Sequence, residues 1–136
     1  MGVLTCDRER ASAAREPLKL DHVQVLTPVG GVGEAARFYR DLVGLEPIER
    51  PETMGGVGAW FRAGPQELHL SEHEPFMPAE KAHPAFELGS DELDALAERL
   101  AAAGAEVRWD DRLPGARRFY SFDPAGNRVE FLSRGS

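Results

Sequence analysis

The sequence predicts an α+β fold of two βαβββ modules, whose strands form a curved mixed sheet around a cavity with the helices outside. Two observations favour this class. The order of strand-like and helix-like segments occurs twice along the chain, and polar residues recur at one fixed distance. His22 and His83 are 61 residues apart (83 − 22), as are His69 and Glu130 (130 − 69). One offset shared by both pairs indicates a duplicated unit.

The first module spans residues 18–72. Its opening segment, 18–26, is short, rich in Val and Leu and partly alternating, which predicts a strand. Phe38 and Leu42 then recur at helical spacing and Gly44 supplies a stop, which predicts a helix at 34–43. Three strands are expected at 45–49, 57–62 and 67–71, separated by turns that contain glycine.

The second module spans residues 83–136 and follows a polar connector at 73–82. It repeats the same order, with a strand at 84–88, a helix at 91–103 that Ser90 caps, and strands at 106–109, 118–122 and 128–132. The segment 123–127, Asp-Pro-Ala-Gly-Asn, predicts a turn between the last two strands. Residues 1–17 are polar and mixed in charge, so we expect a flexible tail there.

Composition excludes several classes of protein. The chain has 136 residues, of which 42% are hydrophobic, as expected for a domain with a core. The net charge of −7 argues against a general nucleic-acid binder, which needs a basic face. No run of eighteen apolar residues exists, so no membrane span is expected. Cys6 is the single cysteine, which excludes an intrachain disulfide and, with no apolar signal segment, predicts a cytoplasmic protein.

Four residues are candidate metal ligands. Side chains alternate across a strand, and this alternation puts His22, His69, His83 and Glu130 on the more polar face of their strands. The opposite faces are apolar enough to pack under a helix. Imidazole nitrogen and carboxylate oxygen bind divalent Zn, Ni, Mn or Fe, so we expect all four to hold one such ion. His73 lies outside this pattern and is expected to be solvated.

Other residues share these polar faces. Gln24 lies beside His22, and Trp60 shares a face with Arg62, which makes these three candidates for substrate binding. On the seventh strand Arg118 is a candidate to hold a carboxylate or phosphate, and Tyr120 a candidate proton donor alongside Glu130. The residues leave a second interpretation open, in which Arg118 is a solvated strand residue and Trp60 belongs to the core.

Three motifs carry a resemblance to a known superfamily. They are Asp-His-Val at 21–23, Phe-Tyr-Arg-Asp-Leu-Val-Gly-Leu at 38–45 and Asp-Pro-Ala-Gly-Asn-Arg-Val-Glu at 123–130. Together with the order of elements over residues 18–132, they resemble the vicinal-oxygen-chelate superfamily. That superfamily includes glyoxalase I, fosfomycin-resistance thiol transferases, extradiol dioxygenases and bleomycin-resistance proteins. The last motif is typical of the superfamily and not of any one reaction.

The resemblance implies ligands from the first and last strands of each module, which are the positions of His22, His69, His83 and Glu130. Glyoxalase I usually has a carboxylate at the position of His69, so this chain departs from that enzyme. Thiol transferases and dioxygenases use two histidines and one carboxylate, matching His22, His83 and Glu130. In those enzymes' pattern, His69 is a fourth ligand or supports a ligand.

Three functions are therefore carried forward. The first is a metal-dependent lyase, isomerase or group transferase that chelates a small oxygen-rich substrate through adjacent oxygens. The second is an Fe(II) extradiol-type dioxygenase, and the third is a non-catalytic protein that binds a small molecule and confers resistance. The resemblance also implies a homodimer. The sequence leaves open whether one chain or two complete the site.

Overall fold

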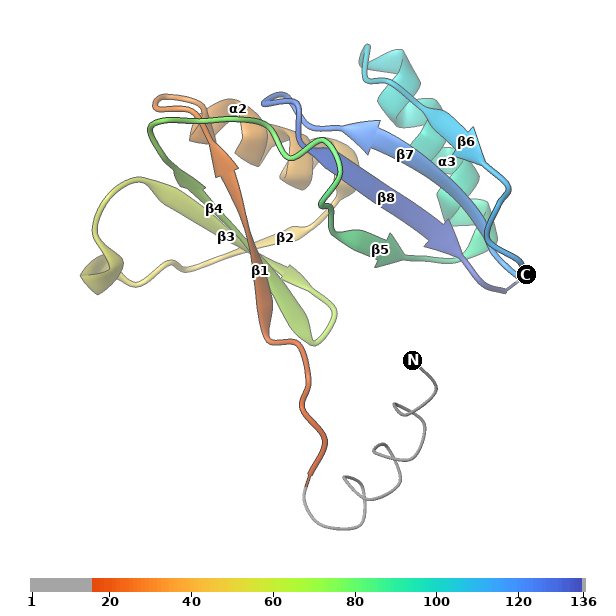
Figure 1. The fold of residues 1–136 in the computed structure, drawn as a ribbon, viewed down its shortest axis with the longest axis horizontal. Helices are drawn as coiled ribbons and strands as arrows, with labels where there is room; N and C mark the ends of the chain where they lie inside the picture. The colour runs from red at the N-terminus through yellow and green to blue at the C-terminus, as the bar shows by residue number, and fades with distance from the viewer. Residues whose placement is uncertain (1–15, 136) are drawn as a thin grey trace.

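The computed structural model describes residues 16–135; the predicted tail up to residue 15, including Cys6, lies outside the described residues. The first half contains two helical segments that run on from each other, a short 3-10 turn and four strands (Figure 1). They are β1 (His22–Thr27), α2 (Val32–Arg37), the π-helix η1 (Phe38–Val43), β2 (Glu46–Ile48), η2 (Glu52–Met54), β3 (Gly58–Ala63) and β4 (Gln66–Glu72). The second half contains β5 (Ala85–Glu87), α3 (Ser90–Ala102), β6 (Arg108–Asp110), β7 (Arg117–Phe122) and β8 (Arg128–Ser133).

The two predicted βαβββ modules are confirmed, because both halves fold into sheets of the same topology. The first sheet has the order β1-β4-β3-β2 and the second the order β5-β8-β7-β6. In each, the first strand of the module runs parallel to the last and the other pairs are antiparallel. The strand pairs also correspond, since Trp60 lies opposite His69 and Tyr120 lies opposite Glu130. The repeat read from the sequence is therefore a structural repeat.

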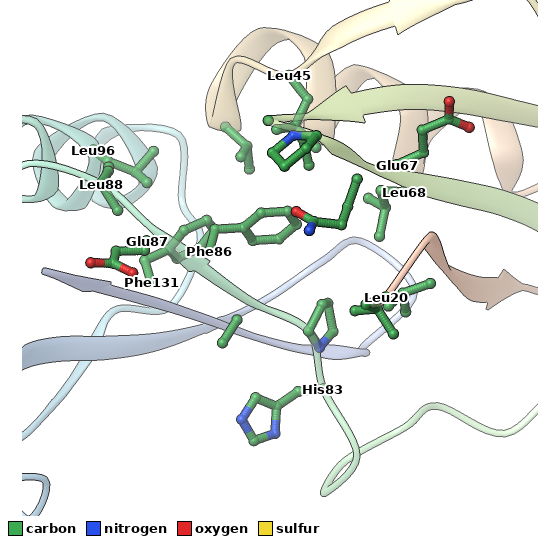
Figure 2. A pocket seen from close by; sticks show the side chains of 18 residues that line it. Leu20, Leu45, Glu67, Leu68, His83, Phe86, Glu87, Leu88, Leu96 and Phe131 are labelled. Carbon is green, nitrogen blue, oxygen red and sulfur yellow. The ribbon is translucent and has the colours of Figure 1, made fainter. Parts of the chain in front are cut away.

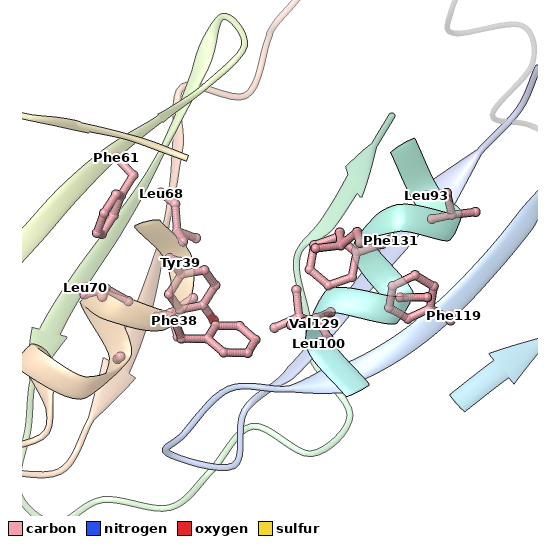
Figure 3. Packing of buried hydrophobic residues seen from close by; sticks show 14 residues of the cluster. Phe38, Tyr39, Phe61, Leu68, Leu70, Leu93, Leu100, Phe119, Val129 and Phe131 are labelled. Atoms are coloured by element: carbon pink, nitrogen blue, oxygen red, sulfur yellow. The ribbon is translucent and has the colours of Figure 1, made fainter. Parts of the chain in front are cut away.

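The strands of one chain form two four-stranded mixed sheets, one from each module. The two halves share one apolar core, in which Phe38 and Tyr39 of η1 lie between side chains of the first sheet and side chains of the second module (Figure 3). Phe61, Leu68 and Leu70 contribute to it from the first sheet, and Phe119 and Phe131 from the second. Burying these residues removes apolar surface from water, which is the main stabilising contribution. The polar faces of both sheets therefore point away from the shared core.

Local geometry differs from the prediction at both helices. The first predicted helix changes from α-helical to π-helical hydrogen bonding at Phe38, although it ends at Gly44 with a φ of 91° as expected. Helix α3 is capped one residue earlier than predicted, at Gly89, whose backbone N–H donates to the Glu92 side chain. The assignment of Ser90 as the cap was wrong, because Ser90 is already helical and its hydroxyl accepts from Arg117.

The predicted turn at 123–127 forms hydrogen bonds between the two modules. Asp123 accepts a hydrogen bond from the Tyr39 hydroxyl of η1 (2.8 Å) and two more from the backbone N–H groups of Ala125 and Asn127. The Asn127 amide donates to the Leu26 carbonyl of β1 at 2.8 Å. Burial, and secondly the Asp123 carboxylate, raise the pKa of Tyr39 well above its usual value. This buried network fixes the β7–β8 turn against the first module.

Candidate metal centre

The first pair of candidate ligands lies on the polar face of the first sheet. His22 and His69 come from neighbouring parallel strands, and their rings stack at 4.3 Å. The other face of His69 is covered by Trp60, whose ring is parallel to it at 3.8 Å. His69 is buried and its Nε2 lies 2.9 Å from Glu67. His69 thus has both ring faces and one nitrogen in contact with neighbours, whereas His22 is exposed.

His22 is oriented for binding. Its Nδ1 lies 2.9 Å from a carboxylate oxygen of Asp21, which favours the tautomer that carries the proton on Nδ1. That tautomer presents the lone pair of Nε2, and Nε2 makes no hydrogen bond to any other residue between 16 and 135. A histidine that ligates a metal usually donates its second N–H in this way.

The second pair, His83 and Glu130, lies on the polar face of the second sheet. His83 Nδ1 lies 2.8 Å from the Lys81 carbonyl, so it must be the protonated nitrogen. In the neutral ring, Nε2 then turns a lone pair toward Glu130 Oε1, 2.9 Å away. A nitrogen lone pair and a carboxylate oxygen at this distance need a cation between or beside them, either a proton or a metal ion.

The spacing of this pair fits a metal centre. Two ligands about 2.1 Å from one ion lie about 3.0 Å apart at right angles and about 3.4 Å apart in a tetrahedral site. The 2.9 Å separation of His83 Nε2 and Glu130 Oε1 is near the lower of these values, so a small side-chain movement would let both bind one ion. Glu130 is only 4% exposed, so its position is fixed by packing as well as by hydrogen bonds.

The structure brings the four predicted ligands together as two pairs and not as one group of four. Within residues 16–135 of a single chain, no three histidine, cysteine or acidic side chains gather in a way that could hold one ion. The physical reason is the shared core: both helices pack between the modules, so the two polar sheet faces turn outward. Within one chain the two pairs stay apart, and the sequence leaves open whether one chain or two complete the site.

The predicted substrate residues have different surroundings. Arg118 is neither free nor solvated, because its guanidinium binds Glu130 Oε2 and Asp110 Oδ1, each at 3.2 Å. Tyr120 is buried with its ring edge-on to His83, 5.5 Å between centroids. The guanidinium of Arg128 lies over the Tyr120 ring at 4.6 Å.

The remaining candidates belong to the first sheet. Gln24 is exposed and lies opposite His69 in the strand pairing, so it shares the polar face. Arg62 is exposed and forms only a long ion pair with Glu46, at 3.7 Å. Trp60 is half-buried and stacks on His69. It therefore belongs neither to the apolar core nor to a free substrate surface.

Sequence reasoning missed three acidic residues that contact the site. Asp21 orients His22, Glu67 contacts His69, and Asp110 holds Arg118. For Glu67 a signal was present, since it lies two residues before His69 and therefore on the same strand face. Asp110 gave no such signal, because its pairing with Arg118 depends on the path of the intervening loop.

A cavity of about 600 Å³ lies between the two modules, but it is apolar (Figure 2). It is lined from the first module by Leu20, Leu45 and Leu68 and from the second by Phe86 and Leu88, with His83 at one end. Most of its walls are apolar, and Glu67 and Glu87 add polar groups to the lining. It is not the polar cavity predicted around the four ligands.

Among residues 16–135, no helix is both long and apolar enough to cross a membrane.

Comparisons with known proteins identify relatives of this chain. The chain is 41% identical to a glyoxalase family protein from Bacillus anthracis, with a TM-score of 0.80, 88% of this chain covered and 97% of that one. It is 33% identical over 95 residues to a manganese-dependent 2,3-dihydroxybiphenyl 1,2-dioxygenase from Geobacillus genomosp. 3, which covers 69% of this chain but only 29% of that enzyme. It is also 28% identical to the glutathione transferase FosA of Serratia marcescens, over 75% of this chain and 72% of the transferase.

These relatives include two enzymes with different reactions, a manganese-dependent dioxygenase and a glutathione transferase. Residues 19–131 match the family described as the glyoxalase/bleomycin resistance protein/dioxygenase superfamily. That match covers both βαβββ modules, all four candidate ligands and the turn that joins the modules. The chain therefore belongs to the glyoxalase/bleomycin resistance protein/dioxygenase superfamily.

Proposed function

We propose that this protein is a metal-dependent enzyme of its superfamily whose metal site is formed between two copies of the chain. His22 of one copy and His83 and Glu130 of the other are the proposed ligands. The observation that carries the proposal is the arrangement of His83 and Glu130, with Nδ1 donated to the Lys81 carbonyl and Nε2 2.9 Å from the carboxylate. This half of a site has ligand geometry but lacks a third donor among residues 16–135 of its own chain.

Two features support a second copy as the source of that donor. Each sheet ends in an edge strand, β1 or β5, that pairs on one side only, and an open strand edge can pair with another chain. The apolar cavity lies between these edges and is partly lined by Leu20 and Phe86. A two-fold dimer that covers the cavity would bring the polar face of one sheet beside the other sheet of the partner.

His69 is proposed to support His22 instead of binding the ion. Its ring is parallel to the rings of both His22 and Trp60, at interplanar angles of 17° and 1°. Two imidazoles that bind one ion point their nitrogens at it from different directions, and stacked parallel rings do not do so. The stack instead limits the rotation of His22.

When bound, the divalent ion supplies a Lewis acid that polarises adjacent oxygens of a small substrate. The chain's own residues hold the ion and orient the substrate. Tyr120, with its ring against His83, is proposed to donate a proton to a substrate oxygen. Gln24 and Arg62, both exposed on the polar face of the first sheet, are proposed to contact the substrate from the other side. We propose that the enzyme is a lyase, isomerase or group transferase and that its metal is Zn, Ni, Mn or Fe.

A dioxygenase is the second candidate, and the 33% identity to a manganese-dependent dioxygenase favours it. With His69 outside the ligand set, three protein ligands leave positions open for oxygen and a catechol-type substrate. Oxygen uptake by the manganese-loaded protein with a catechol would distinguish this reaction from an isomerase or transferase, which consumes no oxygen. Metal binding without turnover of any substrate class would favour the binding protein.

The test is a complementation experiment between two inactive variants. His22→Ala and Glu130→Ala should each bind little metal. If each site combines two copies, a mixed dimer contains one site with both lesions and one intact site. After subunit exchange at equal amounts, about a quarter of all sites should bind Mn²⁺ again, by the statistics of a two-fold dimer. No recovery in dimers shown to be mixed would contradict a shared site, and a monomer by sedimentation would exclude it.

A further inference from the structure

We propose that Arg118 is a positioning residue that fixes how Glu130 meets the metal ion, and that Asp110 acts through Arg118. This inference rests on the proposed metal site and adds a residue role that the ligand set does not require. The predicted role of Arg118 was to bind a substrate anion. Its contacts indicate a different one, because the guanidinium already lies between two carboxylates.

The two oxygens of Glu130 have separate partners. Oε1 faces His83 Nε2 at 2.9 Å, on the side where the second ligand lies, and Oε2 accepts from Arg118 at 3.2 Å. Arg118 therefore holds Oε2 in place and leaves Oε1 as the oxygen directed at the position of the ion. We infer that it favours binding of the ion through Oε1.

Arg118 is itself fixed. Its side chain is 15% exposed, and both Nε and the second terminal nitrogen donate to Asp110 Oδ1, at 3.4 and 3.2 Å. Hydrogen bonds of Arg112 chiefly, and also of Arg118, hold the pKa of Asp110 well below its usual range. Both partners thus stay charged.

The duplication provides an internal comparison. In the second module, Arg118 lies two residues before Tyr120, which pairs with Glu130. In the first module, the residue two before Trp60 is Gly58, and Trp60 pairs with His69. The module with a carboxylate at the ligand position of its last strand therefore has an arginine here, and the module with an imidazole at that position has none. This difference matches a role toward the carboxylate and not a general role in the fold.

The test measures Mn²⁺ affinity and the Mn²⁺ electron paramagnetic resonance spectrum in the full-length protein. Arg118→Ala should weaken Mn²⁺ binding about 10–100-fold, the usual effect of losing a partner of a ligand, and should change the spectrum. Arg118→Lys should recover part of the affinity. Asp110→Asn should weaken binding less than Arg118→Ala, and the double variant should match Arg118→Ala alone, because Asp110 acts only through Arg118. The control is Arg117→Ala, whose side chain binds Asp94 instead and should leave affinity unchanged.

Each result distinguishes the two proposals. If the wild-type protein bound no Mn²⁺, Zn²⁺, Ni²⁺ or Fe²⁺, the metal site would be overturned and this inference with it. The same would follow if Glu130→Ala bound the metal as tightly as the wild type does. Normal binding by wild type and by Arg118→Ala, with loss in Glu130→Ala, would overturn only the inference. If Arg118→Ala kept its Mn²⁺ affinity but lost phosphate binding to the metal-loaded protein, Arg118 would be a substrate residue. Additive losses in the double variant would overturn the role of Asp110.

Discussion

Replacing Tyr39 with phenylalanine tests whether the β7–β8 turn holds the two modules together. The change removes one hydroxyl and leaves the ring in place. Tyr39 is fully buried and its partner Asp123 is 4% exposed, so water does not replace the lost 2.8 Å hydrogen bond. A buried hydrogen bond to a charged group contributes about 1.5–3 kcal/mol, and we expect a loss of about 2 kcal/mol in the free energy of unfolding. For a domain of this size the melting temperature should fall by roughly 4–8 °C.

The pH dependence gives the same experiment a second, independent result. The pKa of Tyr39 is raised in the folded protein by burial and secondly by Asp123. Above about pH 10 the unfolded chain loses this proton while the folded protein keeps it, so the wild type loses stability as the pH rises. The phenylalanine variant has no such proton. The difference in stability between the two proteins should therefore be full below pH 10 and shrink above it.

Urea unfolding followed by circular dichroism at pH 8 and pH 11 measures both effects. Tyr120→Phe is the matched control, because the Tyr120 ring is also buried but its hydroxyl does not donate to a buried carboxylate; its cost should be below about 1 kcal/mol. If Tyr39→Phe melts with the wild type at pH 8, the hydrogen bond adds nothing to stability. If the deficit is the same at pH 11, the explanation through the Tyr39 proton is wrong.

Two further predictions follow from the described contacts. His83→Ala should remove most bound Mn²⁺ from the purified protein without lowering its melting temperature by more than a few degrees. His73→Ala is the control and should leave the metal content unchanged, because His73 is exposed beyond β4. Equal metal content in both variants would argue against His83 as a ligand. Asp110→Asn should be less stable than wild type at pH 6, and the difference should shrink as the pH falls from about 4 toward 2. The lowered pKa of Asp110 gives stability that is fully present above about pH 4 and is lost progressively as the pH falls. Denaturant midpoints across this range measure it, and a difference that grows with acid would contradict the prediction.

The sequence was sufficient for the modules and for the faces of the strands. The offset of 61 residues and the alternation of polar and apolar side chains predicted which residues are equivalent and which side of the sheet each ligand occupies. They did not predict where the equivalent sheets lie. Two copies of a module can pack through their helices or through their polar faces, and the same alternation satisfies both packings.

The contacts of Arg118 show the second limit of sequence reasoning. Its neighbour Asp110 lies on a three-residue strand, and a shift of one residue in that pairing would move Asp110 to the other face. The length and path of the loop at 111–116 decide the register, and neither follows from residue types. The π-helical turn at Phe38–Val43 was hidden for a similar reason, because helical spacing alone does not separate i→i+4 from i→i+5 bonding.

The buried turn at 123–127 has a consequence for protein engineering. Turns between adjacent strands are usually where new chain ends or inserted domains are tolerated, because the loop tip is exposed and its backbone is free. Here Asp123 and Asn127 are 4% and 3% exposed and are hydrogen-bonded to η1, β1 and the connector. A circular permutation or fluorescent insertion at this turn would separate the modules. The exposed Gly55–Gly56 corner before β3 has no such contacts with the second module, and it is the suitable place to cut or extend the chain.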